Sequence, residues 1–182
     1  MNGLAAIWPP SRTAMDGVSL GDAWPCTTMP QSAKWETILP FHKLTQWLTY
    51  SLMQPMESLL NIHFAGTELL TGLPEYRNGG LFVDFGLLSL KRDDAERGME
   101  NYSDWCRRKG IKGVEVAPMF EPSDDVIVEW RGATVGLLDL LCVEINKALK
   151  RELAGHDLSL PQLLEAGSWK VRGLKHHQVI MC

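Results

Sequence analysis

The feature that most constrains the fold is one long helical pattern, which begins at Ser123 and continues to about Arg151. Ser123 is a typical helix N-cap, and Asp124 and Asp125 follow in the first turn, where the helix dipole favours acidic side chains. The residues that define the buried stripe recur at helical spacing and are Ile127, Trp130, Thr134, Leu137, Leu138, Leu141, Ile145 and Leu149. At 1.5 Å rise per residue this helix would be about 40 Å long.

A second helix is predicted from Phe41 to about Leu60. Pro40 stands at its entry, where proline is tolerated, whereas Pro55 should kink the helix or end it early. An apolar stripe follows the same helical period, and we expect it to be buried. The stripe comprises Leu44, Leu48, Leu52, Met56 and Leu59.

The remaining pattern also favours helix. Gly132 and Gly136 are costly inside the long helix and predict the close approach of another backbone. Shorter helices are predicted at 67–71 and 160–166, whereas residues 1–40 hold five of the ten prolines and predict irregular structure. The predicted fold class is therefore mainly α: a single helical domain, or part of one, with an irregular N-terminal segment.

The middle of the chain is less regular. Residues 75–80 read EYRNGG and predict a turn, because asparagine and glycine adopt positive φ at little cost. Residues 81–90 form an almost continuous apolar run, so buried helix and a short strand pair both stay open there. Residues 91–117 carry dense charges of both signs, which is typical of a solvated insertion or a short surface helix with a loop.

Composition excludes several classes of function. The net charge of −4 argues against a nucleic-acid-binding protein, and no run of 18 apolar residues is present to span a membrane. The N-terminus lacks the features of a secretory signal. Four scattered cysteines indicate free thiols in a reducing compartment and offer no metal site, so we expect a cytoplasmic protein. Common nucleotide-binding and hydrolase motifs are absent, and no cofactor is expected.

The tetrad Glu75-Tyr76-Arg77-Asn78 is the first candidate for chemistry. Glu75 could act as a general base, Arg77 could bind a carboxylate or phosphate, and Asn78 could donate and accept hydrogen bonds. The glycines that follow, Gly79 first, would let backbone N–H groups approach a ligand. An exposed turn with an ordinary ion pair is the alternative.

Asp84 lies within the apolar run and is the second candidate. If buried, it must be paired or carry a raised pKa, and it could serve as a general acid or stabilise a sugar cation; if it alternates with the apolar residues of a strand, it faces solvent. His42 and Trp47 could line a pocket wall, although a structural role is the alternative for both. Glu129 and Arg131 cannot face each other at this helical spacing, so each needs a partner elsewhere.

Five ordered blocks resemble the uracil catabolism protein 4 family, which has long been catalogued as a domain of unknown function. They are WPPSRTAMDGVSLGDAWP, PFHKLTQWLTYSL, TGLPEYRNGGLFVDFG, VIVEWRGATVGLLDLL and LPQLLEAGSWK. The resemblance covers residues 1–170 and corresponds to the C-terminal portion of longer family members, whereas 171–182 is a divergent tail. It therefore implies that the N-terminal half of the family fold is a partner of this chain.

The resemblance implies a role in pyrimidine breakdown, with N-glycosidic hydrolysis of a ring-opened ribosylurea phosphate as the reaction. Asp84 or Glu75 would then be the catalytic acid, and Arg77, with Arg12 or Arg131, would hold the phosphate. The remaining ligand contacts would come from Tyr76, Asn78, Gly79, His42 and Trp47. We expect the tetrad and Asp84 to line one concave, partly dry wall. The alternative is a non-catalytic remnant or protein-interaction module of the same family.

Overall fold

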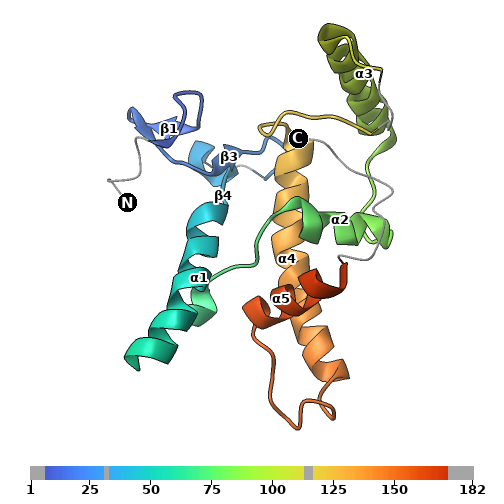
Figure 1. The fold of residues 1–182 in the computed structure, drawn as a ribbon. Helices are drawn as coiled ribbons and strands as arrows, with labels where there is room; N and C mark the ends of the chain where they lie inside the picture. The colour runs from blue at the N-terminus through green and yellow to red at the C-terminus, as the bar shows by residue number, and fades with distance from the viewer. Residues whose placement is uncertain (1–6, 31–32, 113–116, 172–182) are drawn as a thin grey trace.

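Helices dominate the architecture, as the sequence predicts. The computed structural model describes residues 7–30, 33–112 and 117–171 (Figure 1). The helices are α1 (Lys43–Leu60), α2 (Tyr76–Asp84), α3 (Arg92–Lys109), α4 (Asp125–Ala148) and α5 (Leu160–Val171). Shorter elements are the 3-10 helices η2 (Lys34–Thr37) and η3 (Thr67–Leu69) and the strands β1 (Ala14–Met15), β2 (Val18–Ser19), β3 (Ala23–Pro25) and β4 (Ile38–Pro40).

Helix α4 is the central element and packs against α2, α5 and β3 (Figure 1). Its N-cap is Asp124, whose carboxylate accepts a hydrogen bond from the backbone N–H of Val126 at 3.0 Å. The helix has 24 residues, so it is about 36 Å long and confirms the long pattern read from the sequence. Its buried side chains are Ile127, Val128, Thr134 and Leu138. The glycines of α4 behave differently, since no backbone approaches Gly132 or Gly136 within the described residues.

The N-terminal segment forms two small antiparallel sheets, β1–β2 and β3–β4. In the second sheet Trp24 pairs with Leu39, and Trp24 belongs to a core cluster with Cys26, Phe41 and Val128. Aromatic and branched side chains at these positions suit a half-buried strand. The short strand pair predicted near 81–90 is wrong, because that stretch is the end of α2 and a loop. The strands lie in the N-terminal segment instead.

The predicted turn at 75–80 is also wrong, because it forms the start of α2. Glu75 is the extended N-cap residue of this helix, with φ −118° and ψ 161°. Neither Gly79 nor Gly80 adopts positive φ. Gly79 serves instead to let α2 approach α4, since a Cβ there would lie 2.6–2.7 Å from the indole ring of Trp130.

Helix α1 confirms the predicted boundaries but not the predicted burial. It continues through Pro55 to Leu60 rather than ending early, and none of its residues is buried. The apolar stripe that we expected in the core is exposed to solvent in the described structure. Tyr50 Oη donates to the carbonyl of Thr71 at 2.9 Å, so α1 is attached by its other face.

The charged segment that follows α2 forms a helix of 18 residues, α3, which is longer than the short surface helix expected. Its two buried residues, Gly98 and Tyr102, lie on the side that meets the segment before α4, where Met119 N–H donates to the Gly98 carbonyl at 2.9 Å. At the C-terminus, α5 continues past the predicted end near 166 to Val171. The helix predicted at 67–71 is a single 3-10 turn. The tail from residue 172 onward lies outside the described residues.

Candidate functional site

A largely buried ion pair between Asp22, the residue before β3, and Arg131 of α4 organises the region around three of the sequence-predicted residues. Arg131 Nη1 and Nη2 donate to the two carboxylate oxygens of Asp22 at 2.8 and 2.7 Å. The two side chains are only 15% and 14% exposed. This bidentate pair joins positions that are 109 residues apart, and it gives Arg131 the distant partner that its helical position requires.

Asp22 accepts further hydrogen bonds from its own neighbourhood. Trp24 Nε1 donates to the carboxylate at 2.7 Å, and the backbone N–H of Lys43 donates at 3.0 Å from the start of α1. Burial raises the pKa of Asp22, but the hydrogen bonds and the positive charge of Arg131 outweigh it and lower the pKa from 3.8 to about 2. Asp22 therefore acts as a structural hub that ties β3, α1 and α4 together.

The lowered pKa of Asp22 gives a testable pH dependence. Because the folded pKa lies below the unfolded value, the stabilisation is complete above about pH 4 and is lost as pH falls toward 2. A shift of this size corresponds to about 2 kcal/mol. Urea denaturation of the wild type between pH 5 and pH 2 should show this loss, and Asp22→Asn should show a shallower fall in the free energy of unfolding. Equal slopes for the two proteins would contradict the prediction.

Three predicted residues gather around this hub. The guanidinium of Arg131 lies over the ring of Phe41 at 4.1 Å, and that of Arg12 lies over the ring of Trp24 at 4.4 Å. Glu75 forms an ion pair with Lys43 at 3.3 Å. Arg131 is already held by a carboxylate, which disfavours its predicted role as a phosphate ligand.

The other acidic candidate lies elsewhere, so the expected common wall is not formed. Glu75 precedes α2 and Asp84 is its last residue, which places them about 13 Å apart along the helix axis. Asp84 is exposed, as are Tyr76 and Arg77. Arg77 contacts its neighbour, with Nε 3.4 Å from Tyr76 Oη.

Three of the four remaining predicted residues contribute to the local structure of α1 or α2, and the fourth is exposed. Asn78 Nδ2 donates to the carbonyl of Leu73 at 2.8 Å, and Gly79 is packed against α4. His42 is the left-handed N-cap residue of α1, with φ 47°. Trp47 lies on α1 with 54% of its surface exposed to solvent.

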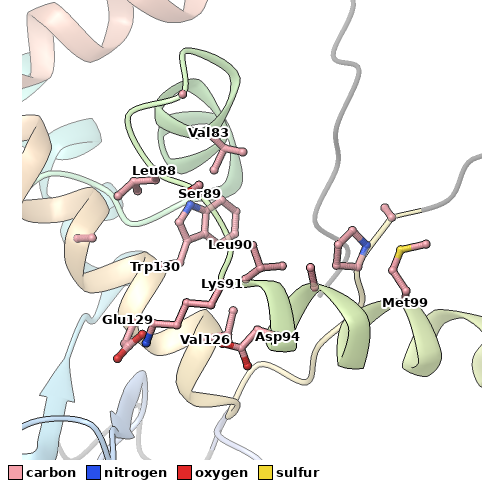
Figure 2. A pocket seen from close by; sticks show the side chains of 15 residues that line it. Val83, Leu88, Ser89, Leu90, Lys91, Asp94, Met99, Val126, Glu129 and Trp130 are labelled. Carbon is pink, nitrogen blue, oxygen red and sulfur yellow. The ribbon is translucent and has the colours of Figure 1, made fainter.

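A cavity that sequence reasoning missed lies between α4, α3 and the loop that follows α2 (Figure 2). Its volume is about 620 Å³. Most of the wall is apolar and includes Val83, Leu88, Leu90, Met99, Ala117, Pro118, Val126, Trp130 and Ala133. The charged lining residues are Lys91, Asp94 and Glu129.

The charged lining residues gather at one end of this cavity. Figure 2 shows the side chain of Lys91 extending toward Glu129, with Asp94 beside them. A second hollow of about 520 Å³ shares all three residues and continues over Thr27, Thr28 and Arg97. An apolar cavity with a few converging polar groups at one end is typical of a small-molecule site.

Neighbouring side chains fix the two carboxylates. Thr28 Oγ1 donates to Glu129, which supplies the distant partner that its position in VEWRG requires. Arg97 Nη2 donates to Asp94 at 2.9 Å and also pairs with Asp124 at the start of α4. The pKa of Asp124 is lowered chiefly by this hydrogen bond from Arg97. The acidic end of the cavity is thus braced by the turn after β3 and by α3.

Trp130 forms part of the cavity wall, and its indole ring packs against α2. Its Nε1 is buried without a hydrogen-bond partner within the described residues, and it lies against Gly79. The sequence signal that could have located this cavity is the junction of the apolar run 87–90 with the charged segment that begins at Lys91.

The described ranges of the chain offer neither a metal site nor a membrane-spanning helix. No three His, Cys, Asp or Glu side chains there come close enough together to hold a metal ion. No helix there combines the length and the apolar character needed to cross a lipid bilayer.

Comparison with known proteins places the chain in a family. The sequence model described as "Protein of unknown function (DUF1688)" matches residues 1–174. The chain belongs to this family. Two similar proteins are uracil catabolism protein 4 of Lachancea kluyveri, 46% identical over 175 residues, and protein urg3 of Schizosaccharomyces pombe, 49% identical over 167 residues. The resemblance read from the five sequence blocks is thereby confirmed.

The matches cover most of this chain but a much smaller share of each relative. They span 93% and 92% of this chain but only 38% and 35% of the two relatives. The chain therefore spans little more than a third of the length of the curated relatives it matches. No solved structure matches the chain.

Proposed function

We propose that this member of the DUF1688 family acts in uracil catabolism and that the cavity between α3 and α4 binds a nucleotide-like intermediate of pyrimidine breakdown. The name of the relative from Lachancea kluyveri supports the pathway. The observation that carries the proposal for the ligand is the cavity itself. Its volume of about 620 Å³ falls in the range of small-molecule sites, and charged groups converge at one end of it.

The lining suits a ring-opened ribosylurea phosphate. Lys91 provides positive charge for the phosphate, and Arg97, which pairs with Asp94 and Asp124, lies nearby. Asp94 and Glu129 can accept hydrogen bonds from urea N–H groups or sugar hydroxyls. Trp130 offers a flat apolar surface beside them. Each part of such a ligand thus has a chemically matched group in one continuous hollow.

The reaction that fits this arrangement is N-glycosidic hydrolysis. The C1′–N bond breaks and a water oxygen bonds to C1′. One proton of that water passes through the carboxylate of Glu129 to the departing urea nitrogen, which gives urea and a sugar phosphate. Positive charge develops at C1′ in the transition state, and a carboxylate fixed in advance stabilises it. Glu129 meets this requirement because Thr28 holds it in place.

Isothermal calorimetry and turnover of ribosylurea phosphate test the proposal. Lys91→Ala should weaken binding about tenfold or more. Glu129→Gln should bind normally and lose turnover by about 100-fold or more. Arg77→Ala and Asp84→Asn are matched controls on α2 and should leave both readouts unchanged.

The reverse pattern, with loss only in the two α2 variants, would assign the chemistry to the residues read from the sequence and overturn the role of the cavity. A wild-type chain that neither binds nor turns over the compound would overturn the catalytic proposal. The non-catalytic interaction module would then be favoured, and the exposed apolar face of α1 is the observation on its side.

A further inference from the structure

Helix α1 presents an unbroken apolar face to solvent. Its members are spaced by three or four residues along the helix and therefore form one stripe. The exposed fractions are 59% for Leu44, 46% for Leu48, 49% for Leu52, 37% for Met56 and 81% for Leu59. Single exposed leucines are ordinary, but a continuous row of five along one helix marks a surface that another element covers.

The opposite face of α1 is the one that the rest of the chain holds. Tyr50 Oη donates to the carbonyl of Thr71 at 2.9 Å, and Gln46 Oε1 accepts from the N–H of Thr71 at 3.4 Å. Lys43 pairs with Glu75 one turn nearer the start of the helix. The segment 71–75 therefore fixes the orientation of α1, and this orientation directs the stripe outward.

A second open patch lies on α4. Gly136, Leu140 and Val143 share one side of that helix at spacings of four and three residues. Leu140 is 64% exposed and Val143 is 51% exposed, and no atom of another described element lies within 4 Å of the position where a Cβ on Gly136 would be. A glycine inside a helix is costly unless something approaches it closely, and this patch has no neighbour among the residues that the structure describes.

The greater length of the relatives indicates which polypeptide covers the α1 stripe. Roughly two thirds of each relative lies outside the part that this chain matches, since the matches span 38% and 35% of them. We propose that the α1 stripe docks the polypeptide that makes up this remainder of the family fold, through an apolar surface on that polypeptide. Identity of 46% and 49% across nearly the whole chain places α1 in the same setting in those longer proteins.

The composition of α1 disfavours a membrane surface as the occupant. Its sequence, KLTQWLTYSLMQPMESLL, has Lys43 as its only basic residue and Glu57 as its only acidic one. Helices that lie on membranes typically carry several lysines or arginines along the polar face, and these bind acidic lipids. A weakly charged helix with a leucine stripe is instead typical of packing inside a protein.

Co-expression tests the proposal. The tagged 182-residue chain is produced together with the part of the Schizosaccharomyces pombe relative that it does not match, and the complex is measured by light scattering after gel filtration and by calorimetry. The stripe variant Leu48→Gln with Leu52→Gln keeps helix propensity and should weaken binding about 100-fold. The matched control is Phe85→Gln with Leu87→Gln, at positions that are 78% and 61% exposed outside the stripe, and it should bind as the wild type does.

Each other result overturns the proposal. No complex with the wild-type chain, or a complex that the stripe variant leaves unchanged, removes the remainder of the fold as the occupant. A particle of twice 20.4 kDa that depends on the stripe would assign the face to a second copy. Binding to lipid vesicles that depends on the stripe would assign it to a membrane. None of these outcomes depends on ligand binding in the cavity, so the docking face and the proposed function fail separately.

Discussion

Replacing Arg131 with alanine should lower the free energy of unfolding by about 3–5 kcal/mol, measured by urea denaturation at pH 7. The substitution leaves the carboxylate of Asp22 buried without its bidentate partner, and that carboxylate is only 14% exposed. It also removes the guanidinium from the ring of Phe41 and the long contact from Arg131 Nε to the Pro74 carbonyl at 3.4 Å. The loss should therefore loosen β3, α1 and α2 together.

An exposed ion pair on the same helix provides the control. Lys147 pairs with Glu144, and both side chains are about two-thirds exposed. Lys147→Ala should change stability by less than about 0.5 kcal/mol because solvent screens such pairs. The double variant Asp22→Leu with Arg131→Met should recover much of the loss, since it removes both charges at once. A cost below about 1 kcal/mol for Arg131→Ala would show that Asp22 does not depend on this partner.

The same hub explains what the sequence could and could not predict about the fold. Local spacing located α4 and α1, because helical period is written into neighbouring residues. The partner of Arg131 is Asp22, 109 residues away, and no local pattern connects them. The prediction that the α1 stripe is buried was wrong for a related reason. Spacing shows which side chains share a face, but it does not show what covers that face.

For the candidate site, too, the sequence predicted individual residues but not the contacts between distant parts of the chain. Glu75 was proposed from its chemistry and Arg12 and Arg131 from the family resemblance, and the structure gathers them near Asp22. The junction at Lys91 marks one edge of the cavity in the sequence, but the cavity as a whole could not be predicted because its wall combines the end of α2, the following loop, α3 and α4. Lys91 and Asp94 lie in a charged run whose pattern indicates a solvated surface. Only their position opposite Glu129 makes them candidates for ligand binding.

The error at 75–80 shows how one residue type can serve two purposes. Asn78-Gly79-Gly80 predicts a turn when glycine is judged by its freedom to adopt positive φ. In α2 the first of these glycines is required because it has no side chain, which lets the helix contact the ring of Trp130. The two uses of glycine are indistinguishable in a single sequence, and they lead to different predictions for substitution.

Substituting Gly79 and Gly80 separately with alanine should therefore give opposite effects on stability. At Gly80 no atom of another part of the described chain lies within 4 Å of an added Cβ, so alanine should stabilise the protein by about 0.5–1 kcal/mol through helix propensity. At Gly79 the added Cβ would lie 2.6–2.7 Å from the indole of Trp130, which is well inside contact distance. The ring or the helix must shift, and overpacking of this kind costs about 1–3 kcal/mol. Thermal or urea denaturation should separate the two variants by about 3 kcal/mol.

A second substitution tests whether Trp130 is the cause. Trp130→Phe removes the part of the indole that carries Nε1, so it should relieve the clash and make Gly79→Ala less costly in that background than in the wild type. Because Trp130 also lines the cavity, Gly79→Ala should weaken ligand binding while Gly80→Ala leaves it unchanged. If the two alanine variants were equally stable, α2 would not pack on Trp130 through Gly79, and the wall of the cavity would need a different support.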